Sequence, residues 1–320
     1  MINAPDTDML IRCMGEMQEY GLSGHSHAAA ASRFPMSRPR PGKEISSGML
    51  RSEILFVNDA YDSRKTGIDD PPGSPSVYKL CMGPEFLSFM CDRMKTQPHG
   101  HLAIQLAFNF EAPLHLRMDG SEAFDLFFFV IPANTPHQMI SPEGRHLTIL
   151  LDPLSVMGRK LTLLSRDRDR FLAYHRAVID SVYPRVRTRL ADFETDSFLN
   201  SVISDLLWLL SDLPRRPMDG RIEKAVARCR INGGKSIGNG DLAAWTALSE
   251  SRARHLFKEE TGVPFTRYLK WLKTMAALKY LFTAGSTLTE AAHMAGFSDS
   301  AHLSRTFREI FGLMPSSVLK

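Results

Sequence analysis

The last hundred residues of the chain carry one sequence pattern twice, and this repeat limits the possible folds more than any other feature. The first copy begins Asp241-Leu-Ala-Ala-Trp-Thr-Ala-Leu-Ser249, and the second begins Thr289-Glu-Ala-Ala-His-Met-Ala-Gly-Phe-Ser298. The two serines lie 49 residues apart, and the glycines that end the copies, Gly262 and Gly312, lie 50 apart. Such internal similarity indicates a duplicated structural unit. We therefore expect two similar units joined by a long helix over 265–282.

Each copy has the order of elements found in a helix-turn-helix motif. A short helix with small residues is followed by a tight turn, at 247–248 in the first copy and at 296–297 in the second. Ser249 and Ser298 stand where an N-cap oxygen would begin the second helix. In helix-turn-helix proteins that second helix enters the major groove of DNA. Two helical hairpins of an all-α bundle are the alternative, but the repeated cap and closing glycine favour DNA binding.

The charge distribution agrees with a polyanionic partner. Residues 221–320 hold 15 Lys and Arg against 8 Asp and Glu, whereas the other 220 residues hold 24 against 27. The net charge of +4 therefore comes from the last third of the chain. A basic excess confined to one region is typical of nucleic-acid binding, although well-solvated domains also show it.

The region before residue 153 has a different periodicity. Short apolar runs of strand length alternate with turns rich in Gly and Pro. Evenly spaced short strands predict a β-sandwich or a small barrel. The candidate strands are 53–57, 77–80, 85–90, 102–110, 114–118, 125–131 and 146–151, and the longest apolar run, 126–132, is expected to form one buried strand.

The remaining segments suggest the domain boundaries. We expect a flexible segment at 1–48, a β domain at 49–155, a helical dimerisation or linker region at 156–216, and a DNA-binding domain at 217–320. The helix predicted over 197–210 has a wide apolar stripe that includes Leu206 and Leu209. This stripe either packs against its own domain or forms a dimer interface. The sequence Leu213-Pro-Arg-Arg-Pro217 then breaks the chain.

Three histidines of the β domain form a candidate site. His99 and His101 lie on the same face of a predicted strand, with Gln105 two pleats further along it. A Pro-rich turn carries the third histidine, His137. Three interpretations stay open: structural hydrogen bonding, polar contacts to a small organic effector, and ligation of a divalent metal. Nearby phenylalanines could line an apolar cavity, namely Phe108, Phe110, Phe124 and residues 127–129.

Composition excludes several other classes of protein. The four cysteines form no CxxC pair, so neither a zinc site nor a disulfide framework is indicated. No apolar run approaches the ~20 residues that span a bilayer. The first twenty residues are acidic where a secretory leader would be basic and apolar. We expect a cytoplasmic protein, associated with the nucleoid when bound to DNA, with no membrane partner and no cofactor.

The second copy carries the most specific motif, Gly296-Phe-Ser-Asp-Ser-Ala-His-Leu-Ser-Arg-Thr-Phe-Arg308, followed by Phe311-Gly312 and Pro315. This motif resembles the DNA-binding domain of AraC/XylS-type transcriptional regulators, and the resemblance covers about 221–320. The first copy is looser. Ala247 stands where the family usually has Gly, Ala253 where it has Leu, and His255 where it often has Arg.

The resemblance implies that the two second helices contact DNA. The implied contact residues are Ser251, Arg252, Arg254, His255 and Lys258 in the first copy, and Ser300, Ala301, Ser304, Arg305 and Arg308 in the second. Arg254 or Arg305 could bind the O6 and N7 atoms of guanine, and Lys258 with Lys270 and Lys273 would attract phosphate. Arg305 could instead pair with an acid of its own domain. The two helices should enter successive major grooves about 34 Å apart.

The β domain resembles the cupin-like sensor domains that often precede AraC-type tails. The expected fold is therefore multidomain α+β, with a cupin-like β-barrel and following helices, then an all-α domain with two helix-turn-helix motifs. The resemblance implies an effector site at His99, His101, Gln105 and His137. The usual cupin metal pattern has a Glu within five residues of its paired histidines, where this chain has Gln105. We therefore predict no bound metal.

Together these features predict a sequence-specific DNA-binding transcriptional regulator, an activator that responds to a small-molecule effector and is not an enzyme. The expected partners are double-stranded DNA, the effector, RNA polymerase and a second copy of the chain in a homodimer. One alternative is a metal-dependent cupin enzyme with a DNA- or protein-binding tail. Another is a regulator controlled by a protein partner instead of a metabolite.

Overall fold

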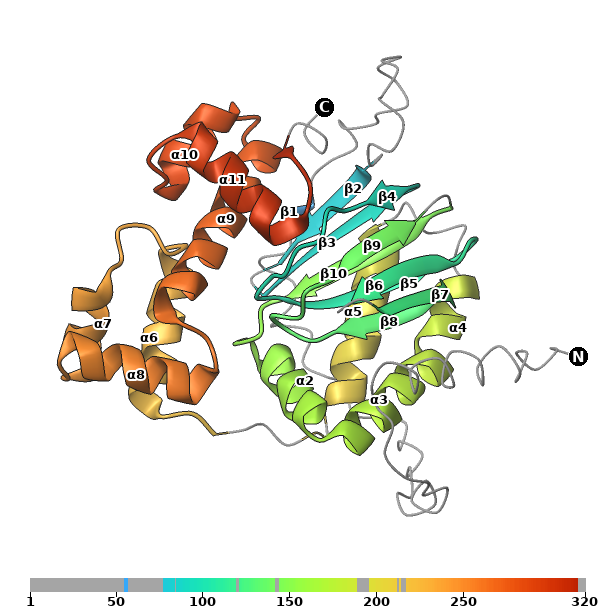
Figure 1. The fold of residues 1–320 in the computed structure, drawn as a ribbon, viewed down its shortest axis with the longest axis horizontal. Coiled ribbons are helices and arrows are strands. Elements are labelled where there is room, and N and C mark those ends of the chain that lie inside the picture. The colour runs from blue at the N-terminus through green and yellow to red at the C-terminus, as the bar shows by residue number, and fades with distance from the viewer. Residues whose placement is uncertain are drawn as a thin grey trace, which may run out of the picture.

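A computed structural model describes residues 55–56, 77–83, 85–118, 121–141, 144–188, 196–211, 213 and 217–315. The segment predicted to be flexible, 1–48, lies outside these residues. The described chain forms a β domain with helices below its sheets and a group of C-terminal helices to one side (Figure 1). This arrangement confirms the predicted multidomain α+β architecture. No described helix is both long and apolar enough to cross a lipid bilayer.

The β domain consists of two antiparallel sheets. The larger has the order β1-β2-β3-β10-β5-β8 and the smaller the order β4-β9-β6-β7. The strands are β1 (Leu55–Phe56), β2 (Val77–Met82), β3 (Phe86–Cys91), β4 (Met94–Lys95), β5 (Ile104–Asn109), β6 (Leu114–Met118), β7 (Ser121–Leu126), β8 (Phe128–Ile131), β9 (Gln138–Ser141) and β10 (His146–Leu151).

Alternating side chains of the larger sheet face two different cores. On the inner face, Ala107 and Leu150 pack in the same buried cluster as Met139 of the smaller sheet. On the outer face, Leu106 and Ile149 pack with the helices that follow the strands. Because successive residues of a strand point to opposite sides, both faces of this sheet are apolar and covered. The covering helices are α2 (Val156–Arg166), α3 (Arg168–Ser181), α4 (Tyr183–Thr188) and α5 (Asp196–Leu210).

Most of the predicted strands are present, but the prediction missed β4 and β9 and was wrong for 125–131. The expected strand over 125–131 is interrupted at Phe127, so that Leu126 ends β7 in the smaller sheet and Phe128 begins β8 in the larger one. The proposed aromatic cavity is also not supported. Phe108 and Phe128 pack against each other in the outer core with ring centroids 4.6 Å apart, and Phe124 is 46% exposed.

The apolar stripe of helix α5 packs against its own domain. Val202, Ile203, Leu206 and Leu210 are each buried in the outer core, and Leu209 packs against the same cluster. Leu206 is only 1% exposed. Of the two interpretations of this stripe, the structure supports packing within the domain, and Leu206 is not available to a second copy of the chain.

The C-terminal helices confirm the duplicated unit. They are α6 (Gly220–Ile231), α7 (Asn239–Thr246), α8 (Glu250–Thr261), α9 (Phe265–Thr283), α10 (Leu288–Ala295) and α11 (Ser300–Phe311). The first helix-turn-helix unit is α7 with α8, the second is α10 with α11, and α9 connects them (Figure 1). Both second helices end at a glycine with positive φ, Gly262 (+75°) and Gly312 (+65°).

The N-caps of the two second helices differ. Ser249 caps α8 as predicted, because its side chain accepts a hydrogen bond from the N–H of Arg252. The prediction that Ser298 caps α11 was wrong by one residue. Asp299 is the cap, and its carboxylate accepts from the N–H of His302 at 2.6 Å and from the Ser298 hydroxyl at 2.9 Å. A carboxylate also interacts favourably with the helix dipole, which explains why it takes this position.

The turns of the two units share a left-handed backbone conformation but not a residue type. Ala247 has φ of +54°, where Gly296 in the second unit has +82°. A side chain in this conformation costs about 1 kcal/mol or more. We expect Ala247→Gly to raise the free energy of unfolding by about 0.5–1 kcal/mol, measured by urea unfolding of the full chain. Ala244→Gly, inside α7, is the matched control and should lower it by about 1 kcal/mol. A destabilised Ala247→Gly variant would contradict this account of the turn.

Candidate nucleic-acid interface and histidine cluster

Helix α8 separates its buried residues from the residues predicted to contact DNA. Ala253, Leu256 and Phe257 pack in the core of the domain. The predicted contact residues are all exposed, namely Ser251, Arg252, Arg254, His255 and Lys258. The helix therefore presents a polar face to solvent from its first turn onward, as a major-groove helix must.

Helix α11 has the same division. Leu303, Thr306 and Phe307 are buried, whereas the predicted contact residues are exposed or half-buried, namely Ser300, Ala301, Ser304, Arg305 and Arg308. The Ser304 hydroxyl donates to the Ser300 carbonyl at 2.8 Å, so it bonds its own helix in this structure. Lys270 of α9 forms an ion pair with Glu309 of α11 at 3.0 Å, which links the connecting helix to the second unit.

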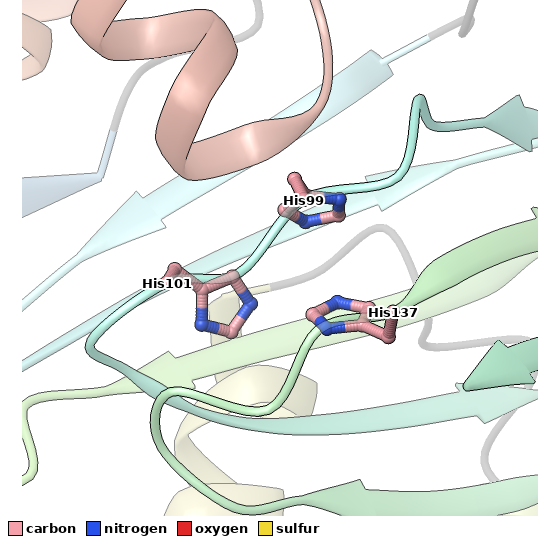
Figure 2. A group of neighbouring side chains, drawn as sticks. All are labelled: His99, His101 and His137. Carbon is pink, nitrogen blue, oxygen red and sulfur yellow. The ribbon is translucent and has the colours of Figure 1, made fainter. Parts of the chain in front are cut away.

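The three histidines meet between the two sheets, close to where the chain enters β5. The backbones of His99 and His137 exchange hydrogen bonds of 2.9 and 2.8 Å. The prediction that His99 and His101 lie on the same face of one strand was wrong, since both lie in the irregular segment before β5, and Gln105 lies on β5 itself. The prediction nevertheless named the residues that come together (Figure 2).

The three imidazole rings form a compact group. The ring centroids lie 4.3 Å apart for His99 and His137, 5.0 Å for His101 and His137, and 5.5 Å for His99 and His101. One nitrogen from each ring lies within 4.8 Å of one nitrogen from each of the others. His101 and His137 are each only 2% exposed, so the group is largely shielded from water.

Backbone carbonyls fix the tautomers of His99 and His137. The Nδ1 atom lies 2.9 Å from the carbonyl oxygen of Gln97 in His99, of Ala103 in His101, and of Thr135 in His137. A carbonyl only accepts, so the neutral rings of His99 and His137 carry their hydrogen on Nδ1 and keep a lone pair on Nε2. The Nε2 atom of His101 lies 2.9 Å from Oε1 of Gln105, which also only accepts, so both nitrogens of this ring face acceptor oxygens.

Burial keeps these rings neutral. Burial, together with the neighbouring histidines of the group, lowers the pKa of His99 to about 4 and the pKa of His137 to about 3. Burial also lowers the pKa of His101. The Nε2 atom of His137 is buried and has no hydrogen-bond partner among the described residues. Purely structural hydrogen bonding therefore leaves this nitrogen unsatisfied, whereas a polar ligand or a metal ion would use it.

Comparison with known proteins identifies the C-terminal region. A family model described as a helix-turn-helix domain matches residues 242–320, which begin within α7 and include α8, α9, α10 and α11. The C-terminal part of this chain is an AraC-type helix-turn-helix domain. A likeness to ToxT from Vibrio cholerae extends over 73% of this chain and 98% of that one, with 12% identity and a TM-score of 0.46.

Curated relatives of the AraC-type domain carry regulator names. An uncharacterized HTH-type transcriptional regulator, YidL of Escherichia coli K12, is 32% identical over 125 residues, which is 39% of this chain and 42% of the relative. The HTH-type transcriptional activator RhaS of Escherichia coli O139:H28 is 28% identical over 169 residues, which is 49% of this chain and 61% of the relative. The chain thus spans about half the length of these relatives.

A group of charged residues that sequence reasoning missed joins the AraC-type domain to the β domain. Arg230, at the end of α6, donates to the Asp152 carboxylate from Nε at 3.0 Å and from Nη2 at 2.9 Å, and to Glu85 from Nη1 at 3.1 Å. The Tyr268 hydroxyl donates to the same Asp152 oxygen at 3.1 Å. The hydrophobic core is also continuous across this junction, since it includes Leu154 as well as C-terminal side chains. No sequence spacing relates these residues.

Proposed function

We propose that the chain is a sequence-specific DNA-binding transcriptional regulator that places α8 and α11 in successive major grooves of one duplex. The observation that carries this proposal is the duplicated unit itself. Each second helix is capped at its N-terminus, buries one face, and leaves exposed on the other face the residue types that bind base edges and phosphates. The regulator names of the relatives support the same conclusion.

Different residues carry specificity and affinity in this proposal. The exposed guanidinium groups of Arg254 and Arg305 bind guanine O6 and N7, which distinguishes base sequences. Lys258 and Arg308 on the second helices, with Lys270 and Lys273 of α9, attract phosphates without regard to sequence. Serine hydroxyls on the two helices and His255 add polar contacts to bases or phosphates.

The β domain supplies the control in this proposal. A small ligand binds at His99, His101, Gln105 and His137, where the buried Nε2 atom of His137 has no hydrogen-bond partner among the described residues. The regulator acts as a homodimer and activates transcription through RNA polymerase. The regulator names of the relatives favour this proposal over a metal-dependent enzyme, and the absence of enzymatic activity stays a prediction.

Selection of DNA by the full-length chain tests the proposal. A pool of random duplexes is bound, recovered and sequenced through several rounds, and affinity for the selected sequence is then measured by fluorescence anisotropy. We expect a consensus with two short elements about 10 base pairs apart, because the two units occupy successive major grooves. Recovery of no consensus, or equal affinity for selected and random duplexes, would contradict sequence-specific binding.

A further inference from the structure

A recess lies where α2 of the β domain meets the end of α8 in the first helix-turn-helix unit (Figure 1). One of its walls is a stripe of α2 that includes Arg159, Leu163 and Arg166. Because these residues are spaced by four and three positions, their side chains lie on one face of the helix. Glu260 of α8 and Met218, just before α6, line the recess from the other side. The recess has a volume of about 420 Å³, part of which is open to solvent, and it shares no residue with the histidine cluster.

The guanidinium group of Arg159 is buried with fewer partners than it has donors. Its side chain is only 10% exposed, and its Nη2 atom donates to the Glu223 carboxylate at 3.2 Å. Its Nε and Nη1 atoms are buried and have no hydrogen-bond partner among the described residues. Buried polar groups in folded proteins are almost always hydrogen-bonded. A group beside the recess thus has two donors to offer to an acceptor on a bound molecule.

Two further charged groups border the recess. Arg166 lies in the last turn of α2 and reaches the end of α8, since a Cβ atom on Gly262 would lie 3.9 Å from its Nη2 atom. Glu260 accepts a hydrogen bond from the Asp219 N–H through Oε2 at 2.9 Å. Its Oε1 atom accepts none from the part of the chain that the structure describes. Positive groups of α2 and a negative group of α8 therefore line the same space.

The rest of the lining is mostly apolar. The apolar residues are Pro153, Leu154, Leu163, Pro217 and Met218. A molecule that uses every part of this lining carries a carboxylate for the guanidinium groups, a cationic donor for Glu260 and an apolar group for the leucines and methionine. An inorganic anion would leave the apolar wall unused, and a simple carboxylic acid would give Glu260 no donor.

We propose that this recess binds a free α-amino acid whose side chain is apolar and about the size of leucine or methionine. The carboxylate of the amino acid accepts from Arg159, its ammonium group donates to Glu260, and its side chain lies against Leu163 and Met218. Arg166 adds a second positive charge near the carboxylate. This site is additional to the histidine cluster, and the inference does not depend on the proposed function.

Calorimetric titration of the full-length chain with leucine and with methionine tests the ligand class. We expect saturable binding of at least one of them, at one site per chain. Isocaproate has the carbon skeleton of leucine without the ammonium group, and isoamylamine has it without the carboxylate. Each analogue should bind about tenfold more weakly or worse, because each loses a charged hydrogen bond. No saturable binding of either amino acid, or equal binding of isocaproate and leucine, would overturn the proposal.

Variants of the two charged walls test the location of the site. Glu260→Gln keeps an oxygen for the Asp219 N–H and removes the negative charge. It should weaken binding of the amino acid by about tenfold and leave the affinity for isocaproate unchanged. Arg159→Met keeps the apolar stem, removes the guanidinium group and should abolish binding. The matched control is Arg170→Met, an arginine of α3 that does not line the recess, and it should bind as the wild-type chain does.

Circular dichroism shows whether Arg159→Met is folded. If that variant does not fold, the comparison of leucine with isocaproate in Glu260→Gln decides the question, because a purely structural role of Glu260 would change both affinities alike. Wild-type affinity for the amino acid in Glu260→Gln would overturn the proposed site. Loss of binding in His137→Ala would place the ligand at the histidine cluster and would overturn it too. A chain that binds the amino acid but selects no DNA sequence contradicts only the proposed function.

Discussion

Replacing Arg305 with Ala should lower affinity for the selected duplex by about tenfold or more and change affinity for random DNA by much less. A bidentate contact from a guanidinium group to guanine is worth ~1–3 kcal/mol of discrimination, and about 1.4 kcal/mol corresponds to a factor of ten. Arg305 is exposed on α11, and Arg254 is exposed on α8 of the other unit. Arg254→Ala should therefore weaken recognition of the other half of the site. Fluorescence anisotropy on both duplexes measures the two effects.

Removal of positive charge by itself would weaken binding to all DNA, so two further variants are needed. Arg117→Ala, on β6 of the β domain and paired with Glu122 at 2.6 Å, removes one charge outside the two units and should leave both affinities unchanged. Lys258→Ala should lower both affinities similarly and reduce the salt dependence of binding. If Arg254→Ala and Arg305→Ala lower affinity equally for selected and random DNA, these residues contact phosphates and do not distinguish bases.

The duplicated unit was predictable because its determinants are local in sequence. Caps, turn residues and closing glycines lie within a few residues of the backbone groups that they satisfy, so their spacing defines the helices directly. Ala247 shows the limit of this reasoning, because it adopts a left-handed conformation that alanine does not favour. Asp299 shows a second limit, since the carboxylate of Asp299, and not the hydroxyl of the neighbouring Ser298, caps α11.

The histidine cluster was predictable in composition but not in geometry. Two histidines separated by one residue would lie on the same face of a strand, which is why the sequence predicted that His99 and His101 are close. The structure brings the histidines together in a different way. His99 pairs with His137 through backbone hydrogen bonds, which brings together two segments nearly forty residues apart in sequence. The fixed tautomers depend on backbone carbonyls whose positions no sequence pattern specifies.

Contacts between the two domains could not be predicted from the sequence. Arg230 and Asp152 are 78 residues apart, and Gln97 and Gly312 are more than 200 apart. Their types alone do not indicate a contact between domains. Arg230 lies at the end of a helix, Asp152 follows a strand, and Gly312 ends a helix, and such residues are common at these places in any fold. Their shared role appears only when the two domains are placed together. Contact between the two domains is therefore a property of the assembled chain, which neither domain's motif specifies alone.

Replacing Leu206 with Asp should unfold the β domain and not simply produce monomers. Leu206 is 1% exposed in the outer core between α5 and the larger sheet. Loss of a buried leucine costs about 2–5 kcal/mol, and burial of an unpaired carboxylate adds to this cost. The sum approaches the total stability of a typical domain, about 5–15 kcal/mol. Urea unfolding followed by circular dichroism should show a large loss of stability or no folded β domain.

Ser204, exposed on the same helix, provides the matched control. Ser204→Asp places a carboxylate in water two residues before Leu206 on the same helix. It should change the free energy of unfolding by only about 0.5 kcal/mol. A Leu206→Asp variant that stays fully folded but becomes monomeric in sedimentation experiments would show that α5 forms the dimer interface after all. That outcome would require Leu206 to leave the core, and with it the packing of α5 against the larger sheet.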